Sequence, residues 1–476
     1  MKRLNELYDC DYDIEIKGIK INSKEVEPGD IFVCTKGVTA DRHDFIDDAI
    51  KNGAAALVVS RDIETSIPTI KVENTNEELP ILVAKFYDYP DKELDLIGIT
   101  GTDGKTSTAT IIQTLIGNDK CGYIGTNGVS SKNYTADNPN TTPDTDLLYK
   151  YFRGFKDSGC KYVSMESSSE AFFRGRLKHF EYSYSVYTNI TSEHLNIHGT
   201  LENYIECKCK LFEQTKKDGS CILNKDDKYY ETVLKHCNGK VYTYGKDENN
   251  DLQIVTFKVY PTKTIIHLKY QEKEFEITSP LLGDFNVYNL CAGLLTCLCM
   301  GFELNELLKN IKYLKIDGRL DMLDVGQNYY VMVDYAHTPN GITKLLNFVH
   351  TLDINRSIVV IGQAGERDYL KRPIVGEVVV NNASYAIFTY EDPRSENPKD
   401  ICEDIIKNIK DTHNNYEIVI DRHEAIKKAI NMAQEKDIVL ILGKGNETYE
   451  KLKDRVIYFN DVEEAMEALK EREGVK

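Results

Sequence analysis

Leu94-Asp-Leu-Ile-Gly-Ile-Thr-Gly-Thr-Asp-Gly-Lys-Thr106 runs from an apolar, strand-like segment straight into a glycine loop. Gly101 and Gly104 allow the tight turn that directs backbone N–H groups at phosphate oxygens. Lys105 adds a positive charge for the β- and γ-phosphates, and Thr106 offers a hydroxyl to Mg²⁺. Residues 107–116 have a helical pattern, and the N-terminus of that helix completes an anion site. The stretch predicts a nucleoside-triphosphate loop formed by Gly101, Thr102, Asp103, Gly104, Lys105, Thr106 and Ser107.

The composition indicates a globular protein. The chain has 476 residues, a net charge of −17, 41% hydrophobic and 28% charged residues, which is typical of about three domains. The acidic balance argues against a nucleic-acid or anionic-membrane partner, because such partners need a basic surface. No apolar run of about 18 residues and no signal-peptide pattern is present, so we expect a cytoplasmic protein without membrane insertion. The 12 cysteines are then expected to be reduced, and their spacing does not indicate a zinc site.

Apolar runs and turn signals divide the chain into three blocks. Residues 1–89 alternate short apolar runs with turns, which predicts a small α/β domain. In residues 90–316, strand-like runs alternate with helical patterns, which favours a mostly parallel sheet. Residues 317–476 contain β-rich runs that each end at polar residues, at the sheet edge where ligands bind in open α/β sheets. These runs begin at Tyr330, Ser357, Tyr385 and Ile438.

Several ionisable side chains follow the predicted strands and are candidates for the chemistry. Glu166 follows the strand-like run Tyr162–Met165, where its carboxylate can hold Mg²⁺; a helix-capping role is the alternative. His194 follows another strand, although a lone His is more often a packed or solvated residue. Lys208 lies in a helical pattern, where a Lys usually faces solvent. The last block adds a basic residue and a strand-end pair, namely Arg319, Asp334 and His337.

Five further segments accompany the glycine loop in a fixed order along the chain. They are Ser23-Lys24 with Glu27–Phe32, Asn140-Thr-Thr-Pro143, Met165-Glu-Ser-Ser168 continuing to Arg176, Phe285-Asn-Val-Tyr-Asn289, and Asp334-Tyr-Ala-His-Thr-Pro339. In this order the segments resemble the motifs of the Mur ligase family, and most closely of its members that add the third amino acid of the peptidoglycan stem peptide. The resemblance covers nearly the whole chain.

The resemblance implies a uridine-binding α/β domain at 1–89, a central domain with a P-loop ATPase-like parallel sheet at 90–316, and a Rossmann-like C-terminal domain at 317–476. It implies ATP and Mg²⁺ as cofactors, with Lys208 carbamylated to an anion beside the metal. The implied catalytic residues are Lys105, Glu166, His194 and Lys208, and the implied metal ligands are Thr106, Glu166, His194 and Lys208. The implied nucleotide-binding residues are, besides the glycine loop, Asn286, Asn289, Arg319, Asp334 and His337. The implied substrate-binding residues are Ser23, Asn140, Thr141, Thr142, Ser168, Arg176, Arg367, Glu391, Asp392, Arg394, Gly443 and Glu447.

By the same resemblance, the reaction joins a free diamino acid to UDP-MurNAc-L-Ala-D-Glu through an acyl phosphate formed with ATP. Such a reaction needs positioning and charge neutralisation more than a covalent nucleophile. Arg394 favours meso-diaminopimelate, because a guanidinium pairs with a second carboxylate. Asp392 stands where relatives that take diaminopimelate have Asn, and its negative charge favours the amine of lysine. We therefore expect diaminopimelate, with lysine as the alternative, and we expect a monomer.

Besides Asp392, four residues depart from the family's pattern, namely Lys24, Asp103, Glu170 and Asn446. They leave two other functions open. One is a ligase similar to folylpolyglutamate synthase, with another carboxylate substrate; the N-terminal block argues against it. The other is a non-catalytic nucleotide-binding protein, and the retained ionisable residues of the central block argue against that function.

Overall fold

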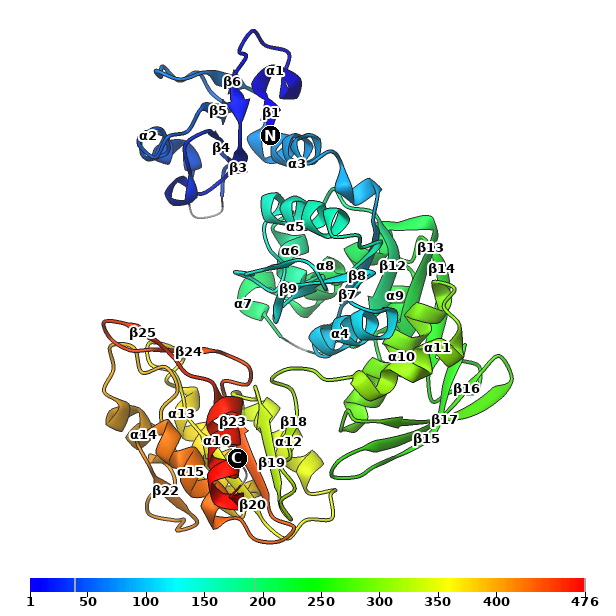
Figure 1. Cartoon of the computed structure of the whole chain (residues 1–476), viewed down its shortest axis with the longest axis vertical. Helices are drawn as coiled ribbons and strands as arrows, with labels where there is room; N and C mark the ends of the chain where they lie inside the picture. The colour runs from blue at the N-terminus through cyan, green and yellow to red at the C-terminus, as the bar shows by residue number, and fades with distance from the viewer. Residues whose placement is uncertain (38–39, 192, 475–476) are drawn as a thin grey trace. The chain divides into compact units, whose positions relative to one another are not determined.

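The computed structural model describes residues 1–37, 40–191 and 193–474 (Figure 1). The chain forms two compact units. The first contains Met1–Gln253 and Tyr288–Leu307, and the second contains Ile254–Val287 and Leu308–Lys476. Both units combine strands with helices, which confirms the predicted α/β class. The predicted domain limits near residues 89 and 316 remain predictions.

The chain begins with a four-stranded parallel sheet in the order β3-β4-β5-β6. Alternate residues of its central strands pack on opposite faces: Ile31 packs with α1 and α3, and Phe32 packs with α2. Fully apolar strands are expected where helices cover both faces of a parallel sheet. The bounds are β1 Lys2–Arg3, α1 Leu4–Leu7, β2 Glu15–Ile16, β3 Gly18–Lys20, β4 Asp30–Val33, α2 Ile46–Lys51, β5 Ala56–Val59, β6 Thr69–Lys71 and α3 Thr75–Phe86.

The larger sheet of the first unit is built around β7 (Asp95–Thr100). β11 and β12 pair with β7 in parallel on either side, and the order is β10-β9-β8-β11-β7-β12-β13-β14-β15. The chain runs from β7 through α4 (Lys105–Ile116) to β8, beyond β11, whereas β12 lies on the other side of β7. The strand order therefore reverses at β7, and open α/β sheets bind ligands at such a point. The other strands are β8 Cys121–Gly125, β9 Gly128–Ser130, β10 Thr135–Ala136, β11 Tyr162–Glu166, β12 Tyr182–Tyr187, β13 Thr215–Asn224, β14 Lys240–Gly245 and β15 Leu252–Val259.

Helix α8 (Leu201–Glu213) brings Lys208 to this sheet. Gly98 in β7 permits the close approach, because a Cβ atom there would lie 2.5 Å from Cδ1 of Leu211 in α8. Thr200 caps the helix by accepting the N–H of Asn203. The remaining helices of this part of the chain are α5 Thr145–Asp157, α6 Ser169–Phe173, α7 Leu195–His198, α9 Tyr230–Leu234, α10 Asp284–Cys299 and α11 Leu304–Asn310.

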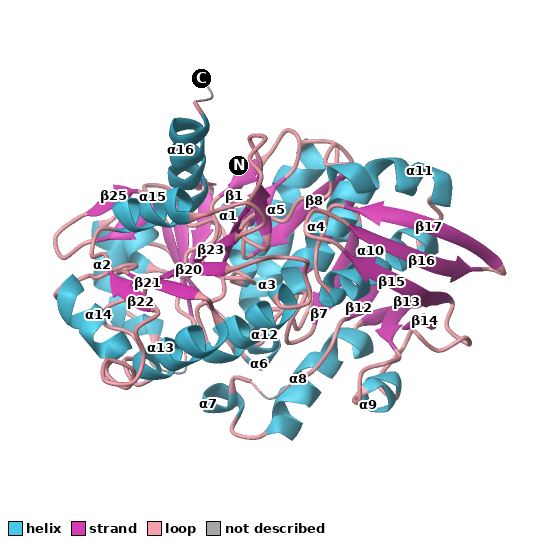
Figure 2. Cartoon of the chain, turned by 90° about the horizontal axis from the view of Figure 1, so that it is seen from below, coloured by secondary structure: helices cyan, strands magenta, loops and turns pink. Residues whose placement is uncertain are grey.

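The second unit contains a six-stranded sheet in the order β18-β19-β23-β20-β21-β22, parallel except for β18. Helices α12, α13 and α14 pack on one face, and α15 and α16 pack on the other. This doubly wound arrangement is Rossmann-like, as predicted. The antiparallel hairpin β16–β17, seen in Figure 2, follows β15 in the order of the larger sheet. The bounds are β16 Thr264–Tyr270, β17 Lys273–Ser279, β18 Asp321–Leu323, β19 Tyr330–Asp334, α12 Pro339–Val349, β20 Ser357–Ile361, α13 Lys371–Asn382, β21 Tyr385–Phe388, α14 Pro398–Ile406, β22 Tyr416–Ile418, α15 Arg422–Met432, β23 Ile438–Leu442, β24 Tyr449–Lys451, β25 Val456–Tyr458 and α16 Asp461–Glu473.

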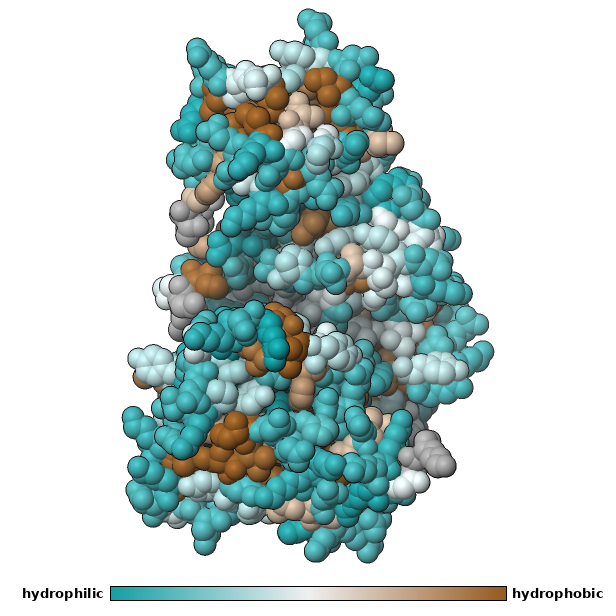
Figure 3. All heavy atoms as spheres, turned by 60° about the vertical axis from the view of Figure 1, so that its left-hand side comes forward, coloured by the Kyte–Doolittle hydropathy of each residue, from teal (hydrophilic) through white to brown (hydrophobic). Residues whose placement is uncertain are grey.

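The strands predicted to begin at Tyr330, Ser357, Tyr385 and Ile438 are confirmed as β19, β20, β21 and β23. Among the described residues, no helix is long and apolar enough to cross a membrane. The face drawn in Figure 3 is mainly hydrophilic, with apolar atoms in separate patches.

Candidate functional site

The glycine loop joins β7 to α4, as predicted. Gly104 occupies the left-handed region with a φ of 85° and begins α4, and no side chain caps this helix within the described chain. The N–H groups of the first helical turn therefore remain available, and such a helix N-terminus favours the binding of an anion. Gly101 must lack a side chain, because a Cβ atom there would lie 1.8 Å from Oγ1 of Thr188.

The segment after β12 holds the loop in place. The N–H of Thr102 donates to the carbonyl of Asn189 (2.8 Å), and the N–H of Asp103 donates to Oδ1 of the same residue (3.1 Å). Oγ1 of Thr188 donates to the carbonyl of Asp103 (2.7 Å). These bonds begin directly after β12, which ends at Tyr187. Asn289 of α10 also reaches the loop, since a Cβ atom on Gly104 would lie 2.3 Å from its Oδ1.

Two lysines meet at the loop carbonyls. Nζ of Lys105 donates to the carbonyls of Gly101 (2.9 Å) and Thr102 (2.8 Å), and Nζ of Lys208 donates to the carbonyl of Gly101 (2.7 Å). Lys208 is only 2% exposed, and its Nζ lies 4.5 Å from the centre of the Tyr204 ring. Burial, and then the charge of Lys105, hold the pKa of Lys208 well below its ordinary value. The alternative prediction that Lys208 faces solvent is therefore wrong.

Glu166 ends β11 beside the loop and is 1% exposed. Its Oε1 accepts hydrogen bonds from the Tyr123 hydroxyl (2.8 Å) and the Thr126 N–H (2.8 Å), and its Oε2 accepts a longer bond from Oγ1 of Thr126 (3.4 Å). Gly125 leaves room for this carboxylate, because a Cβ atom there would lie 2.2 Å from Oε1. Glu166 does not cap a helix; Ser168 caps α6 instead.

A cavity of about 200 Å³ in the first unit is lined by eight predicted residues of the central block, although Glu166 and Thr106 are not among its lining residues. Oγ1 of Thr142 donates to the Glu166 carbonyl (2.7 Å) and accepts the Ser168 N–H (3.1 Å), and Arg176 donates to the Thr142 carbonyl (3.1 Å). These bonds connect the segment at 140–142 to the end of β11. The lining residues are Lys105, Asn140, Thr141, Thr142, Ser168, Ser169, Glu170, Arg176, His194, Tyr204 and Lys208.

His194 lines the same cavity, with a φ of 54° and a side chain that is 51% exposed. An exposed imidazole at a cavity wall is open to a ligand, unlike one that is packed. His198 is the packed histidine of this segment: it is 3% exposed, and its Nε2 shares a hydrogen bond with Oγ of Ser169 (3.1 Å). Burial is the main cause that lowers the pKa of His198.

In the second unit, Asp334 and His337 lie at the end of β19, and hydrogen bonds to the backbone hold both side chains. Asp334 is buried, and its carboxylate accepts the N–H groups of Leu320 (2.9 Å) and Ala336 (2.8 Å). Burial raises the pKa of Asp334, although the charge of Arg319 opposes the change. The Arg319 guanidinium lies 4.9 Å from the centre of the Tyr335 ring. Nδ1 of His337 hydrogen-bonds the Tyr335 carbonyl (2.9 Å), and burial lowers the pKa of this imidazole.

The carboxyl ends of β21 and β23 hold a second group of charges. Nζ of Lys444 lies 3.0 Å from Oδ1 of Asp392 and 3.3 Å from Oε2 of Glu447. Burial raises the pKa of Glu391 to about 7. A Cβ atom on Gly443 would lie 2.9 Å from Oε2 of Glu391, so these two predicted residues are neighbours.

Arg394 lies at the same edge of the second unit. Its N–H donates to the Lys451 carbonyl (2.9 Å), and its φ is 53°. Its buried Nε has no hydrogen-bond partner within the described chain. Buried guanidinium donors are rarely left without a partner, so an anionic ligand is the expected one.

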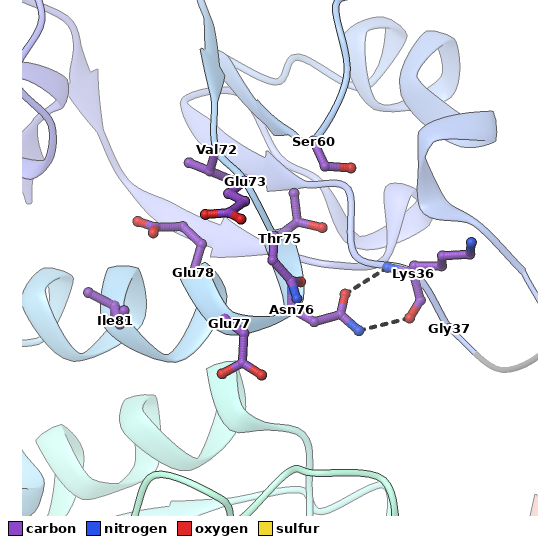
Figure 4. A pocket seen from close by; sticks show the side chains of 11 residues that line it. Lys36, Gly37, Ser60, Val72, Glu73, Thr75, Asn76, Glu77, Glu78 and Ile81 are labelled. Carbon is purple, nitrogen blue, oxygen red and sulfur yellow. Dashed lines mark hydrogen bonds between the residues drawn. The ribbon is translucent and has the colours of Figure 1, made fainter.

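Three predicted residues lie outside these groups. Ser23 is buried in a short 3₁₀ helix, Asn286 is buried and donates to the Leu282 carbonyl (2.8 Å), and Arg367 is exposed in the loop before α13. A larger cavity of about 950 Å³ lies where β4, β5 and β6 end, and Ser23 is not among its lining residues. Figure 4 shows that carboxylates and Asn76 line it, with Asn76 bonded to the backbone of Lys36.

The sequence analysis missed several residues of the site. Tyr204 lies one helical turn before Lys208, and this i, i+4 spacing was a usable signal. Its hydroxyl shares a hydrogen bond with Oγ1 of Thr102 (3.0 Å). Tyr123 and Thr126, which hold Glu166, carried no local signal because they lie some forty residues away in the chain.

Three family models match successive stretches of the chain. Models of the Mur ligase family, catalytic domain, the Mur ligase middle domain and the Mur ligase, glutamate ligase domain match residues 15–91, 99–297 and 318–445. A protein of Geobacillus thermodenitrificans named UDP-N-acetylmuramoyl-L-alanyl-D-glutamate--2,6-diaminopimelate ligase is 38% identical over 96% of both chains. A Bacillus cereus protein of the same name is 37% identical over 98% of both chains.

A solved structure titled as a ligase of that name superposes with a TM-score of 0.70, with 28% identity and 99% of each chain covered. Because three successive family models and relatives of full length match this sequence, the chain belongs to the Mur ligase family.

Proposed function

We propose that this protein is an ATP-dependent ligase that adds meso-diaminopimelate to UDP-MurNAc-L-Ala-D-Glu in peptidoglycan precursor synthesis. The observation that carries the proposal is the single cavity at which Lys105, Lys208 and the segment at 140–142 converge. Full-length relatives that are named for this reaction support it. We also propose that the protein acts in the cytoplasm as a monomer.

In the proposed reaction, the dipeptide's carboxylate attacks the γ-phosphate of ATP, which gives an acyl phosphate and ADP. The amine of the incoming amino acid then attacks the acyl carbon, and phosphate leaves. Lys105 and the open N-terminus of α4 neutralise phosphate charge. Thr142, Ser168 and Arg176 position the peptide at the same cavity. Because no covalent nucleophile is needed, these positioning and charge effects account for the chemistry.

The residues present fit a divalent cation. Among the described residues, no group of three His, Cys, Asp or Glu side chains could hold a metal ion. A metal site that contains Glu166 and His194 therefore needs further oxygen ligands. Within the described chain, Oε2 of Glu166 accepts one long hydrogen bond, and Thr106 is the second residue of α4. The lowered pKa of Lys208 favours the neutral amine, which adds to CO₂ to form a carbamate. We propose that these four residues hold Mg²⁺, which would neutralise charge on the phosphates.

The amino-acid substrate is proposed to bind in the second unit. The unpartnered Nε of Arg394 supports a ligand with a distal carboxylate, which diaminopimelate has and lysine lacks. Glu447 and Gly443 lie at the end of β23, where an ammonium group of the ligand would meet the Glu447 carboxylate. Arg319, Asp334 and His337 are proposed to contact the nucleotide, together with Asn286 and Asn289.

The proposal is tested by measuring ADP release by the full chain with and without UDP-MurNAc-dipeptide, with a panel of amines. We expect ADP and a tripeptide product only when the dipeptide, ATP and a diamino acid are all present. Activity with a folate substrate and none with the dipeptide would favour the related ligase class instead.

Arg394→Ala is expected to lower the preference for diaminopimelate. The guanidinium is predicted to meet a carboxylate that lysine lacks, so the loss should be about 2–4 kcal/mol in transition-state binding of diaminopimelate and much less for lysine. The measurement is kcat/KM for both amino acids. Arg455→Ala, which removes an exposed arginine near β25, is the matched control. A variant that loses activity equally with both amino acids would show that Arg394 supports the loop or the nucleotide instead.

A further inference from the structure

Lys444 follows β23, the strand labelled in Figure 1, and is fully buried, with an exposure of 0%. Its ammonium has two carboxylates within reach: Asp392 at 3.0 Å and Glu447 at 3.3 Å. Burial opposes the charged form, but attraction to Asp392 and Glu447 outweighs it and raises the pKa of Lys444. The ammonium therefore pairs with two carboxylates, and the charges of Glu391, Glu450 and Arg422 act on it from further away.

The two carboxylates differ in their surroundings. Asp392 is 5% exposed, and its Oδ1 also accepts the N–H of Lys451 (3.2 Å). Glu447 is half-buried, and among the described residues its second oxygen accepts a single long hydrogen bond, from the Tyr335 hydroxyl at 3.5 Å. The more buried partner makes the shorter contact, so Asp392 holds the larger share of the lysine's charge. Glu447 therefore keeps more of its negative charge than Asp392 does.

We infer that Asp392 acts as a positioning residue, which draws Lys444 away from Glu447 and leaves the Glu447 carboxylate to bind an ammonium group of the incoming diamino acid. This inference rests on the proposed function. It differs from the expectation that the charge of Asp392 itself favours the amine of lysine, and from direct repulsion between Asp392 and the second carboxylate of diaminopimelate. Asp392 is neutralised inside the protein, whereas Glu447 is the anion with an open oxygen.

The inference makes a prediction that direct repulsion does not make. With Asn at position 392, Lys444 pairs with Glu447 alone and competes with the substrate's ammonium. Diaminopimelate and lysine both carry that ammonium, so Asp392→Asn should raise KM for both by the same factor, between about threefold and tenfold. kcat should stay unchanged, because the lost interaction is uniform binding. Direct repulsion predicts instead a lower KM for diaminopimelate alone.

The experiment measures kcat and KM for diaminopimelate and lysine with the full chain, Asp392→Asn, Glu447→Gln and the double variant. We expect Asp392→Asn to change KM in the wild-type background and to have no further effect on kcat/KM once Glu447 is Gln. Asp454→Asn, an exposed residue between β24 and β25, removes the same charge and serves as the control. Circular dichroism of each variant separates misfolding from loss of binding.

If Asp392→Asn misfolds, the test uses Lys444→Met instead. Glu447 keeps its charge in this variant, so KM for both amino acids should not rise. A lower KM for diaminopimelate alone in Asp392→Asn, an unchanged KM for both, or an undiminished effect in the Glu447→Gln background would overturn the inference. A wild-type chain that forms no tripeptide with either amino acid would contradict the proposed function itself, and this arm distinguishes the two failures.

Discussion

Lys105→Ala is expected to abolish ADP formation while leaving the fold intact. The lysine lies at the first position of α4, and its ammonium is held by the carbonyls of Gly101 and Thr102. Loss of one preorganised charge contact to the transferred phosphoryl group typically costs about 10²–10³ in rate. The side chain is only half-buried, so its removal should change stability little. The measurement is a coupled assay of ADP release, with circular dichroism as the check of folding.

Lys120→Ala is the matched control, because it removes an exposed lysine from the turn before β8. Turnover of the control should equal that of the wild type. If Lys105→Ala keeps the wild-type rate, ATP must bind elsewhere in the chain.

Lys208→Ala is expected to lower the ligation rate by about 10² or more, since a carbamate on this lysine would supply a transition-state charge contact through the metal. Its buried amine donates to the Gly101 carbonyl, so the side chain already touches the phosphate loop. Added acetate or bicarbonate should restore part of the rate of the variant by placing an anion in the vacated space. The measurement is tripeptide formation in buffers with and without these anions.

Lys210→Ala tests whether the position on α8 matters. Lys210 is exposed and lies two residues further along the same helix, so its removal should leave the rate unchanged. Wild-type activity of Lys208→Ala in CO₂-free buffer would rule out the carbamate.

The glycine loop and the strands of the second unit were predictable because their signals are local. An apolar run, a Gly-Lys-Thr and a helical pattern stand next to one another at 94–116, and the alternating cores of β19 and β23 appear as short apolar runs. Fold class and the phosphate loop follow from such patterns alone.

The burial of Lys208 and the pairing of Asp392 were not predictable from local patterns. Lys208 shares a helical pattern with exposed lysines, and it is buried because its amine contacts the Gly101 carbonyl and the Tyr204 ring in the folded structure. Asp392 and Lys444 are 52 residues apart, so their ion pair depends on the adjacency of strand ends in the folded sheet. The resemblance to the family identified these residues in the sequence. Their burial and their ion-pair partners depend on the folded structure.

The most direct test of the proposed reaction uses UDP-MurNAc-L-Ala-D-Glu with ¹⁸O in the glutamate carboxyl groups, together with ATP, Mg²⁺ and diaminopimelate. An acyl phosphate leaves one carboxyl oxygen on the phosphate when the amine attacks. Mass spectrometry should therefore detect one ¹⁸O atom in the phosphate released for each tripeptide formed. Tripeptide formation with unlabelled phosphate, or ADP release without tripeptide, would contradict the account.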